Sequence, residues 1–285
     1  MPTLLQSGAG PVRPLVICYW MGSPQLLAQL AAHTTVILSG GAKKHHFLNP
    51  SNPRLSKIVA DWSKRLNCEF GPVLLAGFSA GCQAVRTQLS AGEYPDATLT
   101  VDGVHSSKPP LPGQLSVWRR WFAACGASLP AGTAAAADCS ADACPYATLT
   151  ATMIEPTTYT GTNATIEAIT GLGLPAGTRA APGILSSGHL RVLTYPGKDA
   201  AAHVYQAKHV LPAELRRLAV ALGFGPGAAP KTTPPPKTTP PPKKAPPPKK
   251  APPKTGPPNT PTASASVGLF AILALILAAA LKATR

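Results

Sequence analysis

The chain has 285 residues, of which 45% are hydrophobic and 13% are charged. This apolar content allows a buried core and excludes a wholly disordered chain, and the length allows one large domain or two small ones. The net charge is +15, but residues 230–262 carry seven lysines and no acid. Because so much of the charge lies in one low-complexity stretch, the basic balance does not indicate nucleic-acid binding, and we expect none.

Cysteine and histidine spacing predicts no metal centre. The sequence contains no Cys-x-x-Cys pair, and the neighbours His45 and His46 lack a third ligand at a suitable spacing. We therefore expect neither a metal nor a cofactor. The N-terminal residues, MPTLLQSGAGPVRP, lack a charged region followed by an apolar one, so we expect no signal peptide.

Residues 14–222 predict strands and helices in alternation. Apolar runs of buried-strand length occupy 14–20, 34–39, 72–78, 97–104, 147–154 and 190–195. The predicted helices cover 25–33, 53–66, the stretch through Leu89, 163–170, and 199–222 with a break at Pro212. Repeated βα units indicate an α/β protein in which helices cover both faces of a parallel sheet of about six strands.

The pattern that carries chemistry is Gly77-Phe78-Ser79-Ala80-Gly81, a GxSxG motif. It follows an apolar strand and immediately precedes a helix. In that context the turn lifts the serine hydroxyl above the sheet, and the glycines allow the helix to approach the strand closely. The helix N-terminus favours developing negative charge. The motif therefore predicts a nucleophile elbow at Ser79.

On this motif and the strand order around it, the chain resembles the α/β-hydrolase family over nearly all of residues 14–222. The resemblance implies a minimal member that lacks the first hairpin. It also implies a histidine base after the last strand, which here is His203, eight residues beyond Tyr195. The acid is Asp102 if it follows the fourth strand, with Glu155 after the fifth strand as the alternative and Asp199 as the third choice.

The resemblance further implies an oxyanion hole formed by the backbone N–H groups of Ala80 and Met21. We expect the substrate site to include Trp20, Phe78, His105, Trp118 and Trp121. The two last tryptophans lie in a long insertion, residues 105–146. That insertion is either a lid over the site or a helix that covers the sheet, and the sequence favours neither.

Beyond residue 226 the composition changes twice. Residues 227–262 repeat Lys, Thr and Pro, which predicts an extended polyproline-II linker after a catalytic domain of residues 1–226. Residues 263–285 contain an apolar run long enough for a single transmembrane helix, so we expect a lipid bilayer as partner. The upstream lysines favour a cytoplasmic catalytic domain.

The sequence thus predicts a membrane-anchored serine hydrolase that cleaves a carboxylic ester of a small or lipid-like molecule. A peptidase or acyltransferase using the same three residues remains open, as does a non-catalytic binding module. A dinucleotide-dependent enzyme is excluded, because the segment YWMGSP after the first strand has only one glycine.

Overall fold

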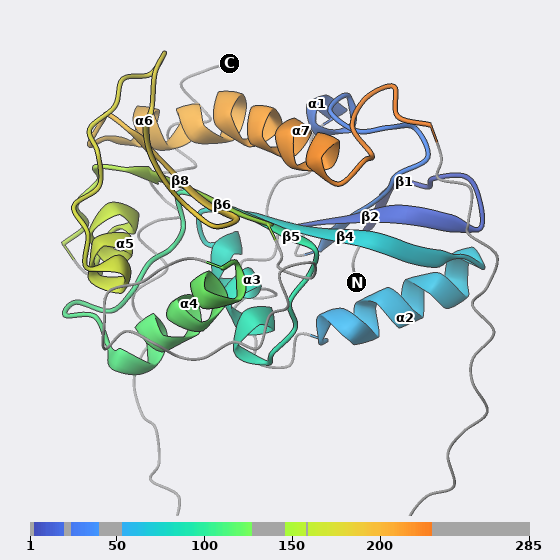
Figure 1. Cartoon of the computed structure of the whole chain (residues 1–285), viewed down its shortest axis with the longest axis horizontal. Coiled ribbons are helices and arrows are strands. Elements are labelled where there is room, and N and C mark those ends of the chain that lie inside the picture. Colours follow the sequence, from blue (N-terminus) through green and yellow to red (C-terminus); the bar gives the residue numbers. More distant parts are fainter. Residues whose placement is uncertain (1–2, 20–23, 40–52, 127–145, 158, 230–285) are drawn as a thin grey trace, which may run out of the picture. The chain divides into compact units, whose positions relative to one another are not determined.

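An eight-stranded sheet in the order β1-β3-β2-β4-β5-β6-β8-β7 forms the centre of the computed structural model (Figure 1). The structure describes residues 3–19, 24–39, 53–126, 146–157 and 159–229. The strands are β1 (Thr3–Gln6), β2 (Val12–Tyr19), β3 (Thr35–Ser39), β4 (Glu69–Phe78), β5 (Ala97–Val101), β6 (Tyr146–Thr152), β7 (Gly183–Ser187) and β8 (Leu190–Tyr195).

The predicted parallel core is present, but the sheet has eight strands, whereas the sequence predicts about six. The strands from β3 through β8 in the sheet order pair in parallel, whereas β1 and β7 add antiparallel edges beside β3 and β8. Both extra strands are short and partly exposed, so they lack the apolar run that marks a buried strand. Two antiparallel strands, β1 and β7, thus stand where the sequence predicted none.

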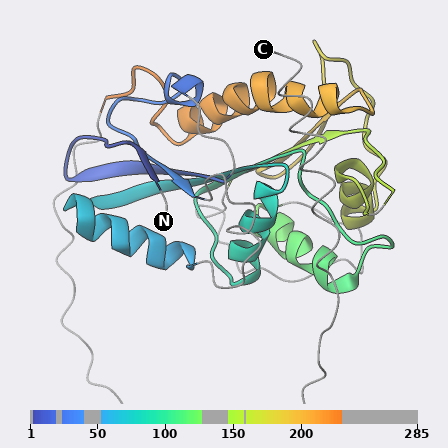
Figure 2. The ribbon, with the colours of Figure 1, turned by 180° about the vertical axis from the view of Figure 1, so that it is seen from behind.

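Helices cover the two faces of the sheet, as Figures 1 and 2 show from opposite sides. One face carries α2 (Leu55–Leu66), α3 (Gly81–Ser90), α4 (Pro112–Ala124) and α5 (Thr162–Thr170). The other carries α1 (Pro24–Leu27), α6 (Ala200–Tyr205), a π-helical turn (Gln206–Val210) and α7 (Leu211–Ala221). Pro212 lies in the first turn of α7, directly after the π-helical turn, and the backbone stays helical across this junction. The predicted break at Pro212 is therefore a change of helix type and not an interruption of the helix.

Strand β2 shows how the sequence fills two core layers. Its alternate side chains Leu15 and Ile17 pack in the cluster that contains α2, α3, α4 and α5, whereas Val16 and Cys18 pack in the cluster that contains α1 and α7. Successive strand residues point to opposite faces, and both faces are covered by helices. That is why the buried strands read as continuous apolar runs rather than as alternating ones.

Within the described residues, no helix is both long and apolar enough to cross a membrane. The segment 263–285, for which the sequence predicts such a helix, lies outside the described residues, as does the linker from residue 230 onward.

Candidate active site

Ser79 stands on a strained turn between β4, which ends at Phe78, and α3, which begins at Gly81. Its φ is 54°, in the left-handed region that a residue with a side chain rarely adopts. The Ser79 N–H donates to the Val101 carbonyl over 2.9 Å, and the Cys82 N–H donates to the Ser79 carbonyl over 3.0 Å. These bonds hold the serine backbone against the end of β5.

Two glycines make room for this turn. A Cβ at Gly77 would lie 3.0 Å from the Cys82 nitrogen, so the start of α3 packs directly on the strand. A Cβ at Gly103 would lie 2.1 Å from the Ser79 carbonyl oxygen and 2.5 Å from the Cys82 sulfur. The Cys82 thiol in turn donates to the Gly77 carbonyl over 3.2 Å. The backbone of the residue pair after β5 therefore packs against the serine turn.

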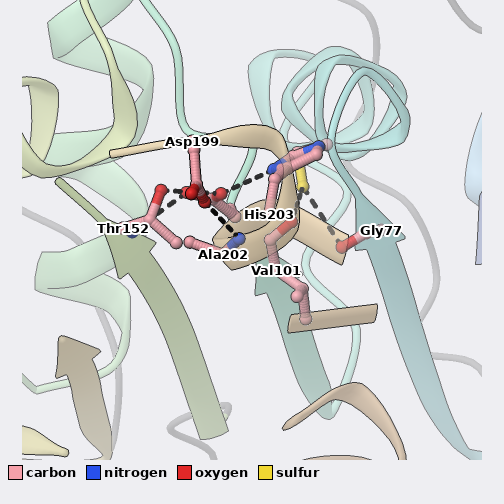
Figure 3. A network of polar contacts seen from close by, with 8 residues as sticks. Gly77, Val101, Thr152, Asp199, Ala202 and His203 are labelled. Atoms are coloured by element: carbon pink, nitrogen blue, oxygen red, sulfur yellow. Dashed lines mark hydrogen bonds and ion pairs between the residues drawn. The ribbon is translucent and has the colours of Figure 1, made fainter. Parts of the chain in front are cut away.

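Asp102 directly follows β5, and its φ of 46° is again in the left-handed region. Its buried carboxylate accepts hydrogen bonds from the Thr152 N–H over 3.0 Å and from the Thr152 hydroxyl over 2.9 Å. The same carboxylate lies 2.6 Å from Nδ1 of His203, as Oδ2 to ring nitrogen. Figure 3 shows this network at the ends of the strands.

His203 lies on α6, one turn after its beginning. The helix is capped by Asp199, whose carboxylate accepts from the Ala202 N–H over 2.8 Å (Figure 3). The imidazole also packs against the ring of Phe78, with 4.6 Å between centroids. Asp102 and Phe78 thus orient His203 from two directions, and Phe78 is the residue immediately before Ser79. Asp199, the third candidate acid, serves as a helix cap.

Electrostatics favour an ionised Asp102. Burial alone raises the pKa of this carboxyl, but the hydrogen bond from His203, the interaction with its charge and the hydrogen bond from the Thr152 hydroxyl outweigh burial, so the pKa lies below its usual range. An ionised carboxylate only accepts, so Nδ1 of His203 carries the proton. In the neutral imidazole with this tautomer, Nε2 is an acceptor, which is the form a general base needs.

The loops after β5 and β6 are joined above this pair. Ser106 and Thr160 form an antiparallel bridge, and the ring of His105 lies 4.7 Å from that of Tyr159. Burial lowers the pKa of His105 to about 4, so this imidazole is neutral near pH 7. Tyr159 is not predicted from the sequence, because nothing in the segment TTYTGT distinguishes it from an ordinary loop tyrosine.

The structure brings some of the predicted site residues together and separates others. Ser79, Asp102 and His203 follow three strands at one edge of the sheet, although no hydrogen bond joins Ser79 to His203 in the described part of the chain. The catalytic hydrogen bonds of a substrate-free enzyme are often long. Glu155 is exposed, and no contact with His203 is recorded for it within the described residues.

The expectation that Trp118 and Trp121 line a substrate site is wrong. Both side chains are fully buried in the core beneath α4, so α4 is a helix that covers the sheet rather than a lid. Trp20 and Met21 lie outside the described residues. Among the residues that the structure describes, no group of three His, Cys, Asp or Glu side chains is placed to hold a metal ion.

Comparison with known proteins gives fold-level likenesses only. No family model and no curated protein matches the chain. Among solved structures, it is similar to a type II thioesterase of yersiniabactin biosynthesis, with 17% identity, a TM-score of 0.36, and coverage of 78% of this chain and 98% of that one. It is also similar to the protein Est1E of Butyrivibrio proteoclasticus, with 11% identity, a TM-score of 0.41, and coverage of 75% and 89%. A protein of unknown function from Agrobacterium tumefaciens matches with 13% identity, a TM-score of 0.43, and coverage of 76% and 95%.

The fold is α/β-hydrolase-like. Its sheet is mostly parallel, helices cover both faces, and a strand–turn–helix carries Ser79. It agrees with the resemblance drawn from the sequence. A fold of this kind hosts many activities, so function has to be argued from the site.

Proposed function

We propose that the protein is a serine hydrolase that cleaves carboxylic esters through an acyl-enzyme intermediate. One observation carries the proposal. A buried, ionised Asp102 is hydrogen-bonded to Nδ1 of His203, and both lie at the sheet edge where Ser79 occupies a strained turn. Backbone strain of this kind is found most often at functional sites.

In the proposed reaction, Nε2 of His203 accepts the Ser79 proton as the hydroxyl oxygen attacks the ester carbonyl carbon. Asp102 holds the imidazole in this tautomer and stabilises the imidazolium that forms. The imidazolium then protonates the departing alcohol, which leaves an acyl group on Ser79. A water molecule, deprotonated in the same way, releases the acid and restores the serine.

The Ala80 N–H is the proposed first donor to the oxyanion. Ala80 is the N-cap position of α3, and its N–H has no backbone acceptor among the described residues. The partial positive charge of the helix start acts on the same point. Removing one such donor typically costs about 2.7–4 kcal/mol of transition-state stabilisation. The second donor remains the proposed N–H of Met21.

Two parts of the proposal lie beyond this geometry. A peptidase or an acyltransferase would use the same three residues, and only the leaving group or the acceptor would differ. Attachment to a bilayer through residues 263–285, with the catalytic part on the cytoplasmic side, is supported by the apolar run and the lysines of the sequence. Partition of the full chain into liposomes, compared with a chain lacking residues 263–285, tests the anchor.

Labelling of the full-length protein with a fluorophosphonate probe tests the activated serine. We expect the wild-type chain to be labelled, and Ser79→Ala and His203→Ala to lose labelling while keeping their circular dichroism spectra. His209→Ala, which removes an exposed histidine beyond α6, is the matched control and should be labelled normally. A folded wild-type chain that resists the probe would favour the binding module instead.

A further inference from the structure

The carboxyl end of β6 holds the acidic partner of His203. Thr152 is the last residue of this strand, and its N–H donates to Oδ1 of Asp102 over 3.0 Å. Its hydroxyl donates to Oδ2 over 2.9 Å, and Nδ1 of His203 lies 2.6 Å from that same oxygen (Figure 3). Two bonds from one residue to the two oxygens of a carboxylate fix the plane of the carboxyl group. Thr152 therefore sets the direction in which Oδ2 faces the imidazole.

The next residue holds the segment that carries His203. The Met153 N–H donates over 3.1 Å to the carbonyl of Gly197, which lies in the loop between β8 and α6. Gly197 has a φ of 112°, and a Cβ there would overlap the methyl group of Ala202. Ala202 directly precedes His203 on α6. Two successive residues at the end of β6 thus contact the acid and the loop that leads to the base.

A buried strand does not by itself require the hydroxyl of Thr152. Thr150 lies two residues earlier on the same face of β6 and is fully buried, yet its hydroxyl has no hydrogen-bond partner within the described residues. Threonine suits a strand through its branched Cβ. The side chain of Thr152 is also buried, with 1% of the residue exposed, so its hydroxyl lies out of reach of a bound substrate.

We propose that Thr152 is a positioning residue for the acid–base pair, fixing Asp102 while the Met153 N–H fixes the loop before His203. This inference rests on the proposed hydrolase function. Reacting groups have to be held within about 0.5 Å of their productive geometry by supporting groups that are themselves locked. Asp102 follows β5 and His203 follows β8, and β6 lies between these two strands in the sheet. Its end is therefore placed to hold both.

Kinetics on a 4-nitrophenyl butyrate substrate test the role of the hydroxyl. We expect Thr152→Val to lower kcat by about tenfold to a hundredfold, the value of a hydrogen bond to a charged group, with little change in KM. Thr152→Ser should recover most of the loss. Thr150→Val, the matched control, removes a hydroxyl without a described partner and should change neither constant. Equal kcat values for the two valine variants would overturn the inference. If Thr152→Val does not fold, Thr152→Cys, compared with Thr152→Ser, takes its place, because a thiol donates only weakly.

The pH profile of kcat/KM separates positioning from a merely structural role. The pKa of the Asp102 carboxyl is raised by burial and lowered more strongly by His203, and the Thr152 hydroxyl lowers it further. The hydroxyl thus stabilises the pair in its more negative form, and the two groups titrate as a pair. The acidic limb should move to higher pH in Thr152→Val and stay in place in Thr150→Val. His105, which also acts on this carboxyl, is unchanged in both variants. A limb that stays in place in Thr152→Val would contradict the assignment.

Gly197→Ala tests the second contact. Gly92→Ala is its matched control, because Gly92 also has a positive φ, of 79°, but a Cβ there meets nothing within 4 Å. Both variants strain the backbone, whereas only Gly197→Ala displaces Ala202 and with it the start of α6. We expect the rate of fluorophosphonate labelling to fall by about tenfold or more in Gly197→Ala alone. Equal rates in the two variants would refute the role of the loop before His203.

Proton NMR of the Ser79→Ala chain keeps the possible failures apart, because it needs no turnover. The Nδ1 proton of His203 should give a downfield signal, identified by its absence in Ser79→Ala/His203→Ala. The signal should persist with Thr150→Val added and shift or disappear with Thr152→Val. If that pattern is found but no ester is cleaved and the fluorophosphonate probe does not react, Thr152 positions the pair and the hydrolase proposal fails. If esters are cleaved while kcat and the signal ignore Thr152, the hydrolase proposal stands and this inference fails.

Discussion

Gly103→Ala is the substitution for which the structure predicts the clearest loss. The added methyl group would lie 2.1 Å from the Ser79 carbonyl oxygen, 2.5 Å from the Cys82 sulfur and 2.8 Å from the Cys82 Cβ. Contacts below 3 Å are not tolerated, so one of the two backbones must move. The carbonyl is fixed by the Cys82 N–H at 3.0 Å, and the serine nitrogen is fixed to β5 at 2.9 Å.

The loss of stability is estimated from the contacts around the Ser79 carbonyl that the added methyl group displaces. Overpacking a filled site costs about 1–3 kcal/mol, and releasing the carbonyl adds about 1 kcal/mol for its hydrogen bond. We therefore expect the free energy of unfolding to fall by about 2–4 kcal/mol. Relief by movement also displaces Ser79, and a misplacement of about 1 Å at a reacting group typically costs about 10²-fold in rate.

Urea unfolding and the rate of fluorophosphonate labelling measure the two effects separately. Gly113→Ala is the matched control, because a Cβ there meets nothing within 4 Å and the residue lies in α4. It should keep the labelling rate and leave stability equal or slightly higher. A Gly103→Ala chain that unfolds and labels like the wild type would show that the loop after β5 does not position the serine.

Three other predictions follow from the same structure. Asp102→Asn should lower kcat by roughly 10⁴-fold, because an amide favours the wrong imidazole tautomer. Glu155→Gln should have little effect on kcat. If an ester assay shows the larger loss for Glu155→Gln, Glu155 is the acid. Because burial holds the pKa of His105 at about 4, the unfolded chain gains a proton first as pH falls below 6.5, so stability should drop by up to about 3 kcal/mol between pH 6.5 and 4. Urea unfolding of His105→Phe should show a flatter profile, and an identical profile would contradict the assignment. Glu214→Gln removes the carboxylate that Arg191 and Arg217 bind, and it should lower the free energy of unfolding by about 2 kcal/mol. Asp61→Asn, in an exposed pair, should lower it by less than about 0.5 kcal/mol. Equal losses for the two variants in thermal unfolding would refute this prediction.

The parallel core could be predicted because its strands are buried on both faces. An apolar run such as Leu190–Tyr195, flanked by polar turns, predicts a buried strand, and β8 has the same bounds in the structure. The edge strand β7 has alternating exposure along GILSS, and β1 has only four residues. Neither carries enough apolar residues to differ from a loop, since edge strands need only one partner to form.

The tryptophans of α4 show that residue composition alone does not distinguish a lid from a helix that covers the sheet. Trp118 and Trp121 next to two arginines fit an amphipathic lid as well as a sheet-covering helix, and only the packing of the helix decides between them. Thr152 and Gly103 could not be predicted for a different reason. Thr152 acts by a contact with Asp102 on the neighbouring strand, and Gly103 acts by the close approach of its backbone to Ser79. Such contacts depend on how neighbouring strands are aligned, which the sequence alone does not specify.

Two features of the strand ends explain why the carboxylate that contacts His203 follows β5. Ser79 and Asp102 are the residues directly after neighbouring parallel strands, and both have positive φ. Each first donates its N–H to the next strand, Ser79 to Val101 and Asp102 to Thr150, over 2.9 Å in both cases. The backbone then turns away from the sheet. Left-handed backbone at a residue with a side chain costs about 1–2 kcal/mol, and here two neighbouring positions bear that cost.

The same turn gives two different results because the following contacts differ. After Ser79, α3 begins and directs its N-terminal N–H groups at the serine. After Asp102, Gly103 packs beneath that helix start, while the Thr152 N–H and hydroxyl, from the adjacent strand β6, bind the carboxylate. A carboxylate after β6 instead, at Glu155, lies three residues beyond the strand and is exposed, and no hydrogen bond holds it within the described residues. The geometry of the strand ends, and not the residue type alone, therefore selects Asp102 as the partner of His203.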